Sequence, residues 1–130
     1  MEPPEFAPGL SARVELTVTD ADTAQSLGSG DVPVLATPRV LALAEVATVA
    51  ATARHLPGGV TTVGTRAEVE HRAPTPVGRT VVGQATLTKV DGRKLVFDVT
   101  IRDGETVVAE VRVERAVVDR QRFIAAALGD

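Results

Sequence analysis

The chain has 130 residues, a formal net charge of −3 and no cysteine, and 44% of its residues are hydrophobic and 24% charged. These values fit one ordinary globular domain and exclude a disordered or collagen-like chain, as well as disulfides, thiolate metal ligands and a cysteine nucleophile. The negative charge and the 2% of aromatic residues also exclude a general nucleic-acid binder, which needs basic side chains and rings for base stacking.

The amino-terminal segment is rich in proline, and we expect residues 1–12 to form a flexible arm in front of a single domain at residues 13–130. The arm has no apolar stretch that would serve as a signal peptide. The longest apolar run, residues 40–53, contains Glu45 and two threonines and is too short to span a bilayer. A cytoplasmic protein with no membrane partner is therefore expected.

Alternation of apolar and polar residues over 13–19 predicts a half-buried first strand. One strong helix signal follows, in which Thr37 is placed to act as N-cap, Pro38 suits the first helical position, and Pro57 stops the helix near residue 56. The alanines and valines of this segment make the helix apolar nearly all round, which is typical of a buried helix.

The remainder predicts strands at about residues 60–73, 80–90, 95–101 and 107–118, followed by a short helix at 119–128. The pairs Asp91-Gly92 and Asp103-Gly104 favour tight hairpin turns, the first of type I′. The predicted fold is α+β, with an antiparallel sheet wrapped around one long central helix. One face of such a sheet lacks a cover within the chain, so it either faces water or is covered by a second copy in a homodimer.

Glu45 is the only charged residue between Arg39 and Arg54, within the apolar helix. An ionised carboxylate in apolar surroundings needs a partner or a raised pKa, and such carboxylates near clefts are candidate bases or nucleophiles. The alternative is that Glu45 lies on one wet edge of the helix, beside Thr48 and Thr52.

His71 is expected on the same strand face as Val63, Thr65, Ala67 and Val69, pointing inward, as a core residue or a catalytic one. Thr37 is a structural cap whose hydroxyl also lies where a helix N-terminus stabilises negative charge.

Gly64 interrupts a strand and so indicates a bulge or the close approach of another group to the backbone. Arg115 falls on the apolar parity of the last strand and is expected to pair with an inward carboxylate. The two histidines are not clustered, so no metal site is predicted.

These residues, taken in order, resemble the hotdog-fold thioesterases, most closely the fluoroacetyl-CoA-specific thioesterase-like family. The resemblance covers about residues 13–125. It is carried by Ala36-Thr37, Glu45, Gly64-Thr65, His71, the turn at residues 73–78 and Glu114-Arg115-Ala116-Val117. It implies a hotdog fold, hydrolysis of a small acyl-CoA thioester to the free acid and CoA, sites between the two subunits of a homodimer, and no metal or organic cofactor.

The resemblance also implies that Thr37, Glu45 and His71 are the catalytic set and that the Gly64 N–H helps to hold the oxyanion. Glu45 either activates water or attacks directly. Residues 31–35 lack the phenylalanines that form a lid in the fluoroacetyl-CoA enzyme, so fluoroacetyl selectivity is not expected. Pro38 stands where that enzyme has glycine, which removes one N–H donor from the helix start.

Two other readings remain open at this point. One is a hotdog domain that binds an acyl-CoA without turning it over, and the other is a hotdog hydratase, in which a carboxylate and a histidine also share a tunnel. The spacing from Thr37 to Glu45 on the central helix favours hydrolysis.

Overall fold

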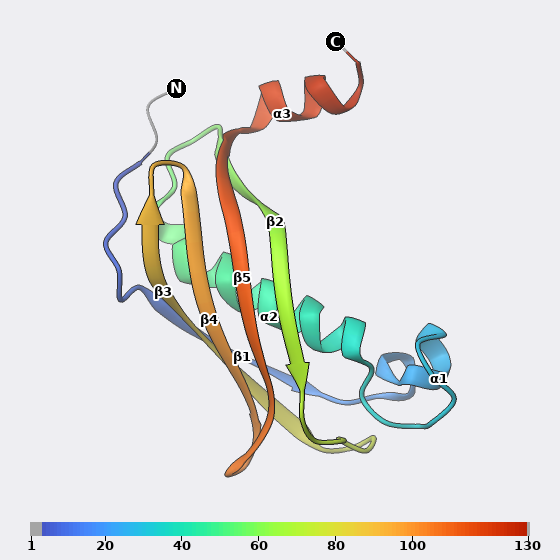
Figure 1. Ribbon diagram of the computed structural model, residues 1–130. Coiled ribbons are helices and arrows are strands. Elements are labelled where there is room, and N and C mark those ends of the chain that lie inside the picture. The colour runs from blue at the N-terminus through green and yellow to red at the C-terminus, as the bar shows by residue number, and fades with distance from the viewer. Residues whose placement is uncertain (1–3, 130) are drawn as a thin grey trace.

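The computed structural model describes residues 4–129 as one five-stranded antiparallel sheet with a long helix against it. The strands stand in the order β1-β3-β4-β5-β2 and span Ser11–Thr17 (β1), Val60–His71 (β2), Thr80–Asp91 (β3), Lys94–Asp103 (β4) and Thr106–Asp119 (β5). The helices are α1 (Ala24–Leu27), α2 (Thr37–Thr52) and α3 (Arg120–Ala127), with 3₁₀ turns at Asp20–Asp22 and Ala53–His55. Figure 1 shows the sheet curving around α2, which confirms the predicted α+β arrangement.

The core lies between α2 and the concave face of the sheet. Alternate residues of the three central strands point at the helix, and Leu87, Leu95, Phe97 and Ile101 are fully buried there. The helix side of this contact is built from smaller residues, among them Val40, Ala44 and Ala47, all fully buried. Because alanine has no side chain beyond Cβ, the sheet approaches the helix axis closely, and each large strand residue that it covers contributes about 1.5–3 kcal/mol.

The opposite face of the sheet is polar. Ion pairs join side chains on neighbouring strands, at Arg72–Glu110, Lys94–Glu114 and Arg112–Asp98. An exposed face of this composition is stable in water without a cover.

The exposed apolar surface lies instead on α2, and the expectation of a helix buried nearly all round was wrong in this respect. Ala42, Val46 and Val49 form a stripe facing solvent, with Val46 53% and Val49 45% exposed. No helix within residues 4–129 is long and apolar enough to cross a membrane.

The two hairpin turns differ from the predicted geometry. The β3–β4 pairing ends at Asp91 and Lys94, so the loop residues are Gly92-Arg93, and the β4–β5 hairpin has Gly104-Glu105 in the same positions. In each loop the glycine has a φ of 58° and its neighbour has a negative φ. One positive φ at the first loop position defines a type II′ turn, which matches the twist of the strands as well as type I′ does.

The first strand begins at Ser11, within the segment expected to be an arm. Just before it, the Gly9 N–H donates to the Leu87 carbonyl at 2.8 Å, and Phe6 and Leu10 pack against the core. The first three residues of the expected arm and the last residue of the chain lie outside the described residues.

Replacing Ala47 by leucine tests the close contact between helix and sheet. The larger side chain has no free space at this fully buried position, so we expect the free energy of unfolding to fall by about 1–3 kcal/mol. Ala126→Leu, at an exposed position of α3, is the matched control and should change stability by less than about 0.5 kcal/mol. Urea unfolding at one fixed protein concentration measures both, and equal midpoints for the two variants would contradict the packing described.

Candidate functional site

A β-bulge interrupts β2 where it pairs with β5. Gly64 is paired with Arg115, whereas Arg66 is paired with the adjacent Glu114, so Thr65 is an extra residue on the β2 side. The Thr65 hydroxyl donates to the Glu114 carbonyl at 3.1 Å, which fixes the bulge. The interruption predicted at Gly64 is therefore confirmed.

The bulge changes which residues of β2 face the helix. Thr62 and Gly64 face it before the bulge, and Ala67, Val69 and His71 face it afterwards, because these five are paired with the inward-facing residues of β5. The prediction that Val63 and Thr65 share a face with His71 was wrong, since the extra residue shifts the alternation by one.

Glu45 and Arg115 form an ion pair between α2 and β5. One guanidinium nitrogen of Arg115, Nη1, donates to Glu45 Oε2 at 3.2 Å. The other nitrogens are held by Thr62, whose hydroxyl accepts from Nε at 3.0 Å and whose carbonyl accepts from Nη2 at 3.1 Å. The Arg115 side chain is 7% exposed and that of Glu45 is 42% exposed, so a fixed cation orients a carboxylate that solvent still reaches.

Burial lowers the pKa of Arg115, and the charge and hydrogen bond of Glu45 act in the opposite direction. A guanidinium stays protonated in proteins, so Arg115 presents a fixed positive charge to Glu45. The predicted pairing of Arg115 with an inward carboxylate is confirmed, with Glu45 as its partner. Sequence reasoning missed Thr62, because its contact with Arg115 depends on a strand register that no local pattern indicates.

The alternative position for Glu45, on a wet helix edge beside Thr48 and Thr52, is correct in part: the Glu45 side chain is 42% exposed, but the two threonines do not share this edge. Both threonines are fully buried, and their hydroxyls donate to the carbonyls of Glu45 and Thr48. These intrahelical bonds satisfy the two hydroxyls without water, leaving Glu45 as the polar group that α2 presents to Arg115.

Gly64 lies directly beneath the Glu45 carboxylate. A Cβ at this position would stand 2.5 Å from Glu45 Oε2 and 3.4 Å from Arg115 Nη1. The glycine thus leaves the space that the carboxylate occupies, in agreement with the predicted close approach of another group to this backbone.

Thr37 and His71 form a second polar group, at the start of α2. The predicted capping role of Thr37 was wrong, since Ala36 is the N-cap residue and its carbonyl accepts the first helical bond from the Val40 N–H. Thr37 is the first helical residue, and its hydroxyl is hydrogen-bonded to His71 Nδ1 at 2.7 Å. Burial lowers the pKa of His71 below its ordinary value of 6.5, and a contact with the Ala73 backbone partly opposes this. The imidazole is therefore neutral at pH 7.

A hollow of about 320 Å³ adjoins this second group, with Thr37 and His71 in its wall. The rest of the wall is mostly small or aliphatic: Ala24, Ser29, Gly30, Val32, Val34, Leu35, Arg72, Ala73 and Pro74. His71 Nε2 is buried and has no hydrogen-bond partner among the described residues. The site therefore combines apolar surface with a hydrogen-bonding atom that is left for another group.

The loop in front of α2 is tied to the helix by Asp22. Its carboxylate accepts from the Thr19 N–H at 2.8 Å, from the Thr19 hydroxyl and from Arg39 Nε at 2.9 Å. Burial raises the pKa of Asp22, but the hydrogen bonds from Thr19 and Arg39 outweigh it, so the pKa lies below its usual value. This anchor holds the wall of the hollow against the start of α2.

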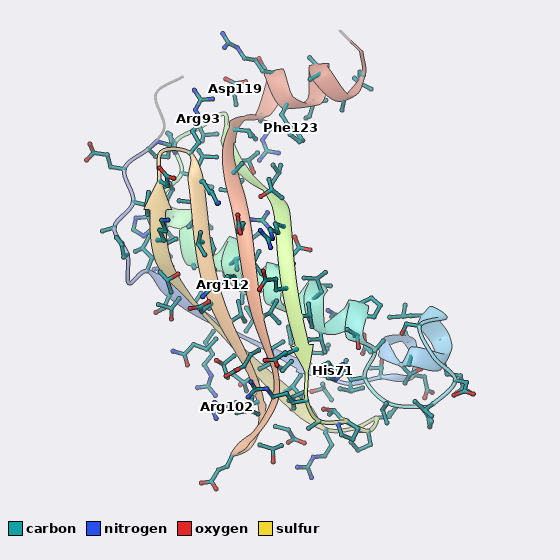
Figure 2. The ribbon with its side chains drawn as sticks, in the orientation of Figure 1. His71, Arg93, Arg102, Arg112, Asp119 and Phe123 are labelled. Carbon is teal, nitrogen blue, oxygen red and sulfur yellow. The ribbon has the colours of Figure 1, made fainter. Side chains whose placement is uncertain are left out.

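The predicted site residues thus fall into two groups within one chain. Glu45 follows Thr37 by eight positions along the helix, which corresponds to a rise of about 12 Å. Thr37 and His71 therefore do not reach the Glu45 carboxylate. Figure 2 shows His71 at the carboxyl end of β2, beyond the middle of the strand where Gly64 lies. No group of three or more histidine and acidic side chains within residues 4–129 is arranged to hold a metal ion.

Comparison with known proteins places this sheet and helix in the hotdog fold. The structure superposes with a TM-score of 0.88 on a hot-dog-like protein from Thermanaerovibrio acidaminovorans, at 26% identity, covering 95% of this chain and 92% of that one. A variant of the fluoroacetyl-CoA thioesterase FlK in complex with acetyl-CoA gives 0.90 at 30% identity, covering 95% and 98%.

The fluoroacetyl-CoA-specific thioesterase family matches residues 18–121, and the chain belongs to that family. The fluoroacetyl-CoA thioesterase of Streptantibioticus cattleyicolor is 39% identical over 90 residues, which are 69% of this chain and 65% of that protein. The match thus spans slightly less than two thirds of that relative's length. The family and fold predicted from the sequence are confirmed.

Gly64→Ala tests the position of the Glu45 carboxylate. The new methyl group would overlap the flexible end of Glu45 and lie in ordinary contact with Arg115 Nη1, so the carboxylate moves away from Arg115 while the fold is kept. We expect thioester hydrolysis that depends on Glu45 to fall about 100-fold, because the substitution displaces the carboxylate by roughly 1 Å. Gly58→Ala, where the added methyl group meets nothing, is the control. Unchanged hydrolysis in Gly64→Ala would show that the carboxylate position does not matter.

The buried imidazole predicts a dependence of stability on pH. Below pH 6.5 the unfolded chain binds a proton at His71 that the folded protein binds only at lower pH. The stabilising contribution is therefore complete above pH 6.5 and is lost as the pH falls toward the folded pKa. We expect His71→Gln to reduce this slope between pH 7 and 5, measured by urea unfolding across the range. Parallel profiles for the variant and the original protein would refute it.

Proposed function

We propose that the protein hydrolyses a small acyl-CoA thioester to the free acid and CoA. The observation that carries the proposal is the Glu45 carboxylate, held on one side by Arg115 above a glycine and open to solvent on the other. Membership of a thioesterase family and the complex of a similar protein with acetyl-CoA support it. The hydrolase requires no metal or organic cofactor.

Thioester hydrolysis needs only modest catalytic assistance, because a thioester carbonyl is electrophilic and a thiolate leaves readily. Glu45 either takes a proton from the attacking water or attacks the carbonyl carbon itself, and Arg115 orients the carboxylate for either role. When water attacks, its oxygen bonds to the carbonyl carbon and the carbon–sulfur bond breaks, which gives the acid and the CoA thiolate. When Glu45 attacks, the same bond breaks to leave a mixed anhydride on Glu45, and water then hydrolyses this anhydride to the acid and the free carboxylate. The Gly64 N–H is proposed to donate to the developing oxyanion.

Thr37 and His71 are proposed to act at the leaving group. The neutral imidazole has one nitrogen occupied by the Thr37 hydroxyl, while Nε2 is left free to hydrogen-bond the reacting thioester. Through this pair a proton reaches the departing sulfur, and Thr37 fixes the orientation of the ring. This assignment needs both polar groups at one thioester.

A homodimer is proposed to bring the two groups together. β2 is an edge strand whose residues 64–68 are exposed, and it lies beside the exposed apolar stripe of α2. Two such edges joined antiparallel about a twofold axis near residue 67, with Thr65 left as the extra residue of each strand, place His71 opposite the partner subunit's Thr62 and Val69 opposite the partner subunit's Gly64. The Thr37–His71 group of one chain then faces the Glu45–Arg115 group of the other.

The substrate is proposed to be a short acyl-CoA without fluoroacetyl selectivity. Residues 31–35 contribute Val32, Val34 and Leu35 to the hollow, and no aromatic side chain lines it. Aliphatic surface of this kind favours an alkyl acyl group through apolar burial alone, at about 0.8 kcal/mol for each methylene. A cytoplasmic location remains a prediction.

Purified protein incubated with acyl-CoAs and a thiol reagent is expected to release CoA. Glu45→Gln should abolish the release, and His71→Ala and Thr37→Val should each reduce it by at least about 100-fold, because general acid–base groups contribute roughly that much. Thermal stabilisation by acyl-CoA without thiol release would indicate a binding module instead. A 3-hydroxyacyl product from an enoyl-CoA would indicate a hydratase.

Mixed dimers test whether the site is shared. When Glu45→Gln and His71→Ala chains are unfolded together and refolded, half of the dimers carry one of each, and one of their two sites contains neither substitution. We expect about a quarter of the original activity to return, because an isologous dimer has two equivalent sites. No recovery, despite sedimentation as a dimer, would mean that each site lies within one chain.

A further inference from the structure

Within residues 4–129, large apolar side chains are exposed in three groups and at the single residue Val77. The first group, Leu27 and Val32, lies near the start of α2 and is 47% and 49% exposed, and the second is the α2 stripe. The third lies in and just after α3: Phe123, Ile124 and Leu128, which are 46%, 50% and 73% exposed. The proposed dimer interface covers the α2 stripe directly. It does not by itself cover the first and third groups, called the end groups below.

The twofold axis brings these end groups to the same place. α3 is attached at the amino end of β2, where the Arg120 N–H donates to the Gly59 carbonyl, whereas His71 ends the strand. Antiparallel pairing of two β2 edges lays the amino end of one strand beside the carboxyl end of the other, which puts the partner subunit's Val60 level with Ala73 in the wall of the hollow. Figure 1 shows α1 and α3 projecting on the β2 side of the sheet, at opposite ends of the strand.

The charges of the two segments are complementary. Residues 20–31 carry Asp20 and Asp31, besides Asp22, whose charge is already paired with Arg39, and they carry no basic residue. α3 carries Arg120 and Arg122 and no acidic residue. Opposite charges around an apolar centre favour contact between these two segments over contact of either with its own copy.

Resting on the function and the dimer given above, we propose that α3 of each subunit closes the hollow of the other and that Phe123 of the partner subunit lines the acyl site. The hollow lacks an aromatic side chain of its own, and a ring brought in by the second chain completes its apolar wall. Phe123 is then a specificity-determining residue. It limits the length of the acyl group and excludes water from the thioester.

The absence of cysteine makes this contact easy to test, since two introduced cysteines have no background. Val32→Cys combined with Phe123→Cys in one chain should give a covalent dimer on mild oxidation or with a short bis-maleimide. Arg102→Cys replaces Phe123→Cys in the matched control, because Arg102 lies at the far end of the sheet from Phe123 in Figure 2. The control pair should remain unlinked.

Acyl preference gives a second readout. Phe123→Ala should raise the ratio of kcat/KM for hexanoyl-CoA to that for acetyl-CoA by at least about tenfold, because the limiting wall is removed. Arg102→Ala, at an exposed position far from Phe123 in Figure 2, should leave the ratio unchanged.

The results separate this inference from the function on which it rests. If the double-cysteine protein stays unlinked, or Phe123→Ala keeps the original ratio, while Glu45-dependent hydrolysis and the dimer persist, the α3 contact is refuted and the hydrolase stands. If no acyl-CoA is hydrolysed, the function has failed, whereas the cross-link still reports the α3 contact by itself.

Discussion

The candidate site depends on one irregularity, the extra residue at Thr65. A strand alternates faces strictly, so without the bulge Gly64 and His71, seven residues apart, would point to opposite sides of β2. With it, both face α2 and both find a partner on the helix, Glu45 and Thr37 respectively. The extra residue therefore places both the Gly64 end and the His71 end of β2 against the helix.

The ion pair between Glu45 and Arg115 adds little to the stability of the fold, because forming it requires desolvation of the guanidinium. Burying a guanidinium requires several kcal/mol of desolvation, which a half-exposed carboxylate repays only in part, and Thr62 satisfies the remaining donors. An apolar residue at position 115 would pack as well in this core. The arrangement makes sense as a device that holds a carboxylate in one orientation, at the place where helix and strand approach most closely.

The sequence predicted the α+β fold class and nearly every helix and strand, because these depend on local periodicity. It predicted the family because the family is marked by particular residues in a characteristic order. It also marked Glu45, Gly64 and Arg115 for sound physical reasons: a lone charge in an apolar helix, a glycine in a strand, and a cation on an inward parity. What it could not give depends on pairing between distant segments. The register of β2 against β5 decides which face of the strand His71 lies on and brings Thr62 into contact with Arg115. The role of the Thr37 hydroxyl depends on the residue at which the helix begins.

The polar face of the sheet bears on how the protein behaves when it is crowded. Its cross-strand pairs at Arg72–Glu110, Lys94–Glu114 and Arg112–Asp98 are matched within the molecule, so a second sheet laid flat on this face would strip water from ions that already have partners. Stacking of two such sheets therefore gives no favourable free energy. The outer face of the curved sheet can therefore stay uncovered at high protein concentration without seeding aggregates.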